Sequence, residues 1–134
     1  MMRGMTTLET RLEIKSWDEK PYRELPDGTK FARAEVVLAG TAELTGGTFE
    51  ALLYYRPDGT GTYTSLMSLT GTLDGRTGTL VLAGEGGYDG ASARSESRVV
   101  DATGDLAGLT GTLTSVSTHA DYPYMPLVLT YQLG

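Results

Sequence analysis

The tetrapeptide Thr-Gly-Thr-Leu occurs three times in this chain, and each copy stands beside a glycine-rich reversal. The copies occupy residues 70–73, 77–80 and 110–113, and a short turn containing Asp74-Gly75 separates the first two. Asp-Gly between alternating segments is a strong signal for a β-hairpin, because both central turn residues take a positive φ. The repeats therefore predict a meander of antiparallel strands.

Alternation of apolar and polar residues with a period of two recurs along the chain, and no apolar pattern has helical spacing and length. Eight strands are expected, at about residues 8–15, 30–44, 48–56, 62–73, 79–85, 91–100, 109–118 and 125–133. They predict an all-β fold, an eight-stranded antiparallel β-barrel, because closure of a sheet removes its exposed edges. A β-sandwich is the alternative.

Proline marks several segments between the expected strands. The sequence Pro-Asp-Gly at 57–59 is typical of a tight turn, since proline presets φ and glycine tolerates a positive φ. The stretches 17–28 and 119–126 also carry prolines. Both are expected to be loops, with at most a short helical turn around Glu19.

The size, charge and composition of the chain exclude several classes of partner. Its 134 residues suit a single domain, residues 1–134, in which residues 1–5 are expected to be disordered. A net charge of −6 argues against nucleic acid and against an anionic membrane surface. No apolar run approaches the roughly 20 residues of a membrane helix, and the start does not resemble a signal peptide. The absence of cysteine fits a cytoplasmic location.

The inner face of the expected barrel combines large side chains with unusually small ones. The large side chains expected to point inward are Tyr55, Tyr63, Met67, Leu69, Leu80, Leu82, Leu127, Leu129 and Tyr131. Two neighbouring strands instead present small side chains, among them Ser95, Ser97 and Ser117. Large side chains only just fill an eight-stranded barrel, so a wall of small residues leaves room. Either the tyrosines fill this room and hydrogen-bond to the serines, or a small hydrophobic ligand occupies it.

Few residues are candidates for chemistry. His119, the only histidine, stands where a strand ends, and it is suited either to acid–base catalysis at a barrel mouth or to a hydrogen bond within a loop. Trp17, the only tryptophan, falls by alternation on the polar face of the first strand and is a candidate for the rim or for a subunit contact. Arg56 is a second rim candidate. One histidine, no cysteine and dispersed carboxylates predict no metal site, and no motif implies a cofactor.

Several segments resemble, in the same order, an uncharacterised bacterial family, the domain of unknown function DUF3224. They are SWDEKPY at 16–22, YRPDG at 55–59, LTGTLDGR at 69–76, GDLAGLTG at 104–111 and the Leu-x-Leu-x-Tyr pattern at 127–131. The resemblance covers about residues 6–133. It implies an eight-stranded antiparallel barrel of the allene oxide cyclase-like type, room for a central cavity, and a homo-oligomer, either a dimer or a trimer. It implies no reaction.

Three functions stay open on the sequence alone. The first and preferred one is a barrel that binds a small hydrophobic ligand without catalysis, through Tyr55, Tyr63, Met67, Ser95, Ser97, Ser117, His119 and Tyr131. The second is an isomerase or cyclase that acts in the barrel cavity, for which His119 and Glu85 are the candidate ionisable groups. The third is a structural module that forms a homo-oligomer through the outer face of its sheet.

Overall fold

The computed structural model describes residues 4–134, which form eight antiparallel strands and one short 3-10 helix. The strands are β1 (Thr6–Glu24), β2 (Lys30–Ala39), β3 (Leu44–Tyr55), β4 (Gly61–Leu73), β5 (Arg76–Tyr88), β6 (Ser92–Gly104), β7 (Thr110–Thr118) and β8 (Tyr124–Gln132), with the helix η1 (His119–Asp121) before β8. The prediction of an all-β fold with eight antiparallel strands is confirmed. Within residues 4–134, no helix has the length and hydropathy needed to cross a membrane.

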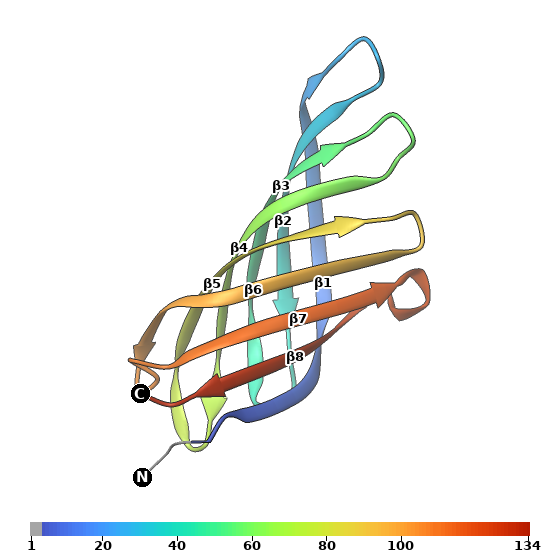
Figure 1. Cartoon of the computed structure of the whole chain (residues 1–134). Coiled ribbons are helices and arrows are strands. Elements are labelled where there is room, and N and C mark those ends of the chain that lie inside the picture. The colour runs from blue at the N-terminus through green and yellow to red at the C-terminus, as the bar shows by residue number, and fades with distance from the viewer. Residues whose placement is uncertain (1–3) are drawn as a thin grey trace.

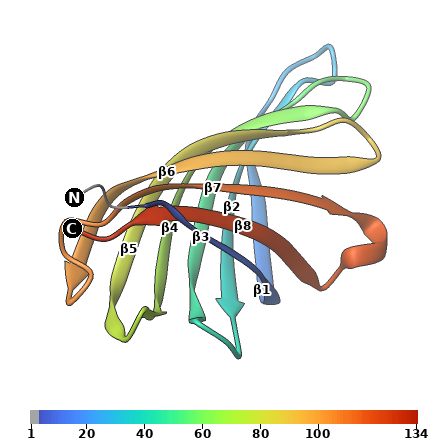
Figure 2. The same ribbon diagram turned by 60° about the horizontal axis from the view of Figure 1, so that its bottom comes forward.

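The sheet closes into a ring, because each strand pairs with the next one along the chain and β8 pairs with β1 (Figures 1 and 2). The hairpins β1–β2, β3–β4, β5–β6 and β7–β8 fan out at one end, which we call the splayed end (Figure 1). The remaining connections, the start of β1 and the end of β8 lie at the opposite end, which we call the terminal end (Figure 1).

β1 closes the ring because its two halves pair with different strands. Its first half, up to Glu13, pairs with β8, and its second half, from Glu13 to Glu24, pairs with β2. The register with β2 shifts between Ile14 and Ser16, so Lys15 is the extra residue of a β-bulge. Since side chains alternate between the faces of a strand, one extra residue exchanges the faces for everything that follows.

Two sequence predictions are wrong in this part of β1. Most of the stretch 17–28 is strand, because pairing with β2 continues to Glu24, and only residues 25–28 belong to a turn. Trp17 does not lie on the polar face, because it pairs with the buried Val36, and residues directly opposite each other share a face of the sheet. Simple alternation counted Lys15 as a regular strand residue and therefore assigned the wrong face to Trp17.

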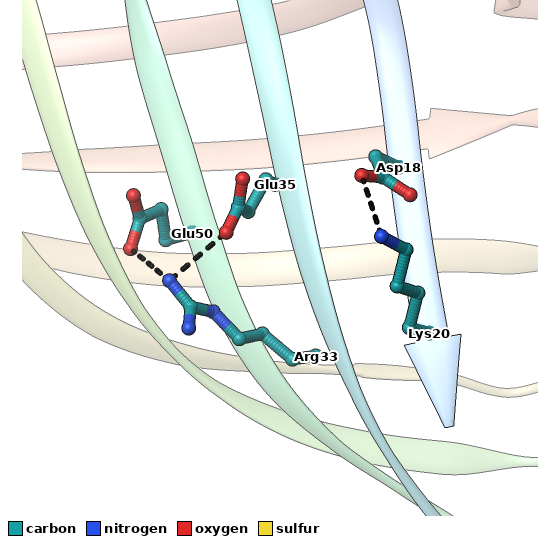
Figure 3. A network of polar contacts seen from close by, with 5 residues as sticks. All are labelled: Asp18, Lys20, Arg33, Glu35 and Glu50. Carbon is teal, nitrogen blue, oxygen red and sulfur yellow. Dashed lines mark ion pairs between the residues drawn. The ribbon is translucent and has the colours of Figure 1, made fainter. Parts of the chain in front are cut away.

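The outer face of β1, β2 and β3 carries paired charges (Figure 3). Arg33 Nη2 lies 3.0 Å from Glu35 Oε1 and 3.6 Å from Glu50 Oε2. On the second half of β1, Lys20 Nζ lies 3.7 Å from Asp18 Oδ2. Such exposed pairs each contribute about 1 kcal/mol or less to stability.

The first two hairpins of the splayed end use the same turn. The sequence Pro-Asp-Gly-Thr occupies both 26–29 and 57–60. In each copy the aspartate accepts a hydrogen bond of 2.9 Å from the backbone N–H of the threonine two residues later. In each copy the glycine has a positive φ, 95° at Gly28 and 89° at Gly59. The turn predicted at 57–59 is confirmed, and the copy at 26–29 fixes the end of β1.

Apolar side chains occupy the inner face from the terminal end to the middle of the ring. The most buried of them are Leu12, Leu44, Leu69, Leu73, Leu80, Leu82, Leu106, Leu113 and Leu129. Leu106 and Leu109 belong to the connection between β6 and β7, and both are buried in this core. Burial of a leucine side chain contributes about 1.5–3 kcal/mol, so this leucine core is the main source of stability.

The boundaries of two other expected segments differ from the structure. The expected strand 30–44 is divided, because β2 ends at Ala39 and the chain reverses before β3. The expected loop 119–126 contains η1, and β8 already begins at Tyr124. Disorder is expected for residues 1–5, and of these, residues 1–3 lie outside the described residues.

Replacing Gly59 by alanine tests the contribution of the repeated turn. Its φ of 89° is unfavourable for a residue with a Cβ, although no atom lies within 4 Å of where that Cβ would stand. We expect Gly59→Ala to lower the free energy of unfolding by about 1 kcal/mol in urea denaturation. Gly4→Ala is the control, because its position is equally open and has no positive φ. Equal losses in both variants would contradict strain at the turn.

Candidate functional site

A hollow of about 590 Å³ lies at the splayed end, between the first and second hairpins. Its lining residues are Glu19, Glu24, Leu25, Gly28, Thr29, Lys30, Tyr55, Arg56, Pro57 and Gly59. We call it the hairpin hollow. Its size lies within the range of small-molecule sites, which is about 300–1,000 Å³. The two Pro-Asp-Gly-Thr turns form part of its wall, so the same local sequence that ends the strands also shapes this hollow.

Glu19 is the polar centre of the hairpin hollow. It pairs with the buried Ala34, which places its side chain on the inner face of the ring. The hydroxyl of Tyr55 donates to both carboxylate oxygens of Glu19, at 3.1 and 3.0 Å. The indole N–H of Trp17 donates to Glu19 Oε1 at 3.2 Å. Two aromatic side chains from different strands therefore hold this carboxylate in place.

Tyr55 is held in its neutral form by this environment. Burial is the largest cause that raises its pKa to about 12, and the hydrogen bond to Glu19 is the second. A folded-state pKa above the unfolded value means that the neutral phenol is favoured by folding. This contribution to stability is complete below about pH 10 and is lost as the pH rises through about 12.

The hairpin hollow also contains a cation close to an aromatic ring. Lys30 Nζ lies 4.9 Å from the centroid of the Tyr55 ring, which is within the range of a cation–π contact. Lys30 pairs across the sheet with Glu24 on one side and with Tyr55 on the other. Arg56 is directed elsewhere, since its Cζ lies 5.6 Å from the ring of Tyr54.

A second hollow, of about 410 Å³, lies on the other side of the β3–β4 hairpin. Arg56 lines both hollows, and Tyr88 and Arg94 line this one. The hydroxyl of Tyr88 lies 2.9 Å from His119 Nε2, and the two rings meet edge to face at 6.0 Å. His119 thus links η1 to the end of β5. It does not line the hairpin hollow.

The tyrosines of the inner wall lie over glycines of the neighbouring strand. A Cβ on Gly61 would stand 3.2 Å from Tyr55 Cδ1, and a Cβ on Gly86 would stand 2.4 Å from the ring and hydroxyl of Tyr63. Burial raises the pKa of Tyr63, and a hydrogen bond with Ser95 opposes this rise. Both aromatic side chains therefore lie flat against the neighbouring strand, in the space left by the missing Cβ of each glycine.

Small residues form a row on the inner wall below these tyrosines. Cross-strand pairing links Glu19, Ala34, Ala51, Ser65, Gly84 and Ser97 in this order. Ser65 is buried, and its Oγ has no hydrogen-bond partner among the described residues. The next row towards the terminal end consists of Trp17, Val36, Phe49, Met67, Leu82 and Val99. The site therefore lies directly above the apolar core.

The structure brings some of the predicted site residues together and separates others. Tyr55, Tyr63, Ser95, Ser117 and His119 lie in the half of the ring nearest the splayed end, as the pairing of their strands shows. The other predicted residues lie deeper or elsewhere.

Met67 and Ser97 are buried in the middle of the ring. Tyr131 lies at the terminal end, where its hydroxyl donates to Asp74 Oδ2 at 3.0 Å. Burial is the first cause that raises the pKa of Tyr131, and this hydrogen bond is the second. Of the two rim candidates, Arg56 lies at the splayed end and lines the hairpin hollow. Trp17 lies in the same row as Met67, one row nearer the terminal end than Glu19, to which it donates.

Sequence reasoning missed Glu19 and Lys30 as site residues. Glu19 was placed in an expected loop, and no periodic pattern identifies a carboxylate that a bulge turns inward. The repeated Pro-Asp-Gly-Thr was the available signal, because two identical turns predict two hairpins at the same end of a meander. Within residues 4–134, no group of three or more histidine, aspartate or glutamate side chains is arranged to hold a metal ion.

Neutralising Glu19 tests the hydrogen bond that holds Tyr55. We expect Glu19→Gln to lower the pKa of Tyr55 from about 12, because the charge that favours the neutral phenol is removed while burial remains. NMR titration of ring-labelled tyrosine measures this shift, with Tyr55→Phe to assign the signal. Asp18→Asn, on the outer face of the same strand, is the control. An unchanged pKa in Glu19→Gln would show that burial alone perturbs Tyr55.

Comparison with known proteins is consistent with this architecture. The chain is similar to the crystal structure of a protein with unknown function from the DUF3224 family of Shewanella oneidensis MR-1, with a TM-score of 0.73 and 22% sequence identity. The similarity covers 98% of this chain and 99% of that one, and it concerns the fold. No curated protein is similar enough to count as a match. The family model described as "Protein of unknown function (DUF3224)" matches residues 8–127, and the chain therefore belongs to the DUF3224 family.

Proposed function

We propose that this protein binds a small amphipathic molecule in the hairpin hollow. The observation that carries the proposal is a carboxylate fixed in place at the hollow: Glu19, which accepts hydrogen bonds from Tyr55 and Trp17. Ligand sites combine mostly apolar walls with a few fixed polar groups that orient the ligand. Because these groups are already in position, a ligand does not have to order them when it binds.

The walls of the hairpin hollow supply the apolar contacts. Leu25 and Pro57 come from the two turns, and the ring of Tyr55 and the stem of Lys30 come from the strands between them. Leu25 is exposed, although leucine gains free energy when it is covered. A ligand with an apolar body would bury this surface.

The proposed function is the one preferred from the sequence, binding of a small ligand, but the proposed site lies in a different part of the structure. The predicted set extended to Met67 and Tyr131, whereas the proposed site uses Tyr55 and Trp17 together with Glu19 and Lys30. We also propose that the closed ring has the allene oxide cyclase-like architecture and that the protein acts in the cytoplasm. The ring closure and the absence of cysteine, respectively, support these two points.

Replacing Leu25 tests the proposed ligand site. We expect Leu25→Ser to weaken binding of decyl-chain amphiphiles about fivefold, since a partly buried leucine contact contributes about 1 kcal/mol. Val100→Ser is the control, because Val100 is also exposed but lies outside the hollow. Native mass spectrometry of protein purified from its own host shows whether a ligand is retained. Failure of every amphiphile tested to bind would contradict the proposal.

The outer face of the sheet supports a second proposal, a homo-oligomer. Leu52 and Leu66 are 54% and 59% exposed, and they line an outer groove of about 350 Å³ beside Arg33 and Glu50. Exposed apolar side chains bordered by charges are typical of protein interfaces. A second copy packed on this groove would cover the leucines and lie beside the Arg33–Glu50 ion pair.

Sedimentation equilibrium tests the oligomer. We expect a dimer or a trimer for the native chain and a monomer for Leu66→Lys, because a buried unpaired lysine opposes association. Val116→Lys is the control, since Val116 is 47% exposed on β7 and does not line the groove. A native chain that is monomeric at all concentrations would contradict this second proposal and would leave ligand binding untouched.

A further inference from the structure

We infer that the ligand of the hairpin hollow carries an organic cation, an ammonium group, which binds the Glu19 carboxylate beside the rings of Trp17 and Tyr55. This inference rests on the proposed function and adds to it the chemistry of the head group. It depends on three properties of the site: the unneutralised charge of Glu19, the aromatic rings around it, and the balance of the other charges that face it.

Glu19 is a half-buried carboxylate that takes part in none of the ion pairs recorded among residues 4–134. Its hydrogen bonds come from two neutral donors, the Tyr55 hydroxyl and the Trp17 indole. A carboxylate offers about four lone-pair sites, so acceptor capacity remains for another donor. A partly desolvated anion of this kind is stabilised by a cation that approaches it.

The rings beside Glu19 also favour a cation. An ammonium group is attracted to the face of tryptophan or tyrosine, and aromatic side chains recognise quaternary ammonium ligands in this way. Tyr55 already attracts the chain's own ammonium group, since Lys30 Nζ lies 4.9 Å from its ring centroid. Trp17 does not line the hollow itself, but it is 48% exposed and its indole N–H bonds to Glu19.

The charges that line the hollow balance, because Glu19 and Glu24 are matched by Lys30 and Arg56. Lys30 lies over the ring of Tyr55, and it takes part in no ion pair recorded among residues 4–134. Arg56 is drawn towards Tyr54, which pairs with the outward-facing Phe31 and Thr62. The second hollow is lined by one carboxylate, Asp89, and by two cations, Arg56 and Arg94.

The net charge of the whole chain acts in the same direction. With −6 at pH 7, its long-range field attracts cations and repels anions. An anionic head group would therefore have to approach an acidic protein and then lie beside the Glu19 carboxylate. A neutral head group can donate a hydrogen bond to Glu19 but lacks the attraction between opposite charges.

Three decyl amphiphiles that differ only in head group test the inference. Trp17 is the only tryptophan and bonds to Glu19, so its fluorescence reports directly on the site. Below their micelle concentrations, we expect decyltrimethylammonium to bind at least tenfold more tightly than decanoate or decyl maltoside. We also expect its binding to weaken with added salt, because the attraction is electrostatic.

Variants of Glu19 provide the second part of the test. We expect Glu19→Gln to weaken decyltrimethylammonium binding at least tenfold and to leave decyl maltoside unchanged. Glu19→Asp, which keeps the charge on a shorter side chain, should lie between the two. Asp18→Asn is the matched control: Asp18 is the neighbouring residue, but it faces outward and pairs with Lys20 (Figure 3).

The outcomes separate this inference from the proposed function. Equal or tighter binding of decanoate, or unchanged ammonium binding in Glu19→Gln, overturns the cationic head group while ligand binding in the hollow stands. If none of the three amphiphiles binds, the proposed function fails and the inference fails with it. Thermal unfolding of each variant shows whether it is folded, and Glu19→Asp keeps the test decisive if Glu19→Gln is not.

Discussion

The β-bulge at Lys15 is the feature on which the rest of this structure depends. It lets one 19-residue strand pair first with β8 and then with β2, which closes the ring. It also exchanges the faces of the strand, so a segment rich in charged residues turns Trp17 and Glu19 inward. Without the extra residue, Asp18 and Lys20 would face the apolar wall of β2, at a high cost in desolvation. Ring closure and the candidate site therefore have the same cause.

The glycines of the inner wall explain how a small ring accommodates several tyrosines. Tyr55 packs over Gly61 and Tyr63 packs over Gly86. Their aromatic side chains therefore occupy little of the space inside the closed sheet. Their hydroxyls then find partners on the wall, Glu19 for Tyr55 and Ser95 for Tyr63. The hydroxyl of Tyr55 therefore bonds to an inward carboxylate and not to one of the serines that the sequence suggested as partners.

Most of the fold could be predicted from the sequence, because the turns and the alternation are local signals. Pro-Asp-Gly at 57–59 and Asp74-Gly75 marked reversals correctly, since glycine is needed there for positive φ. The site was harder to predict. A bulge depends on which strands pair, so the inward position of Glu19 could not be read from β1 alone. Lys30 was missed for a related reason, because its contact with Tyr55 exists only once β2 and β3 are in register.

The second half of β1 must resist pairing with another chain and must also leave its inner face accessible to a ligand. Beyond Glu13 it pairs with β2 alone among the described strands, so its other edge is exposed and open to pairing with another chain. Charged residues and Pro21 protect such an edge, because proline lacks a donor and charges resist burial. Exposure of the edge also leaves the inner face accessible, which is why Trp17 is half exposed although it faces inward. A carboxylate on this strand serves both requirements: it discourages pairing with another strand, and it offers a fixed charge to a ligand at the splayed end.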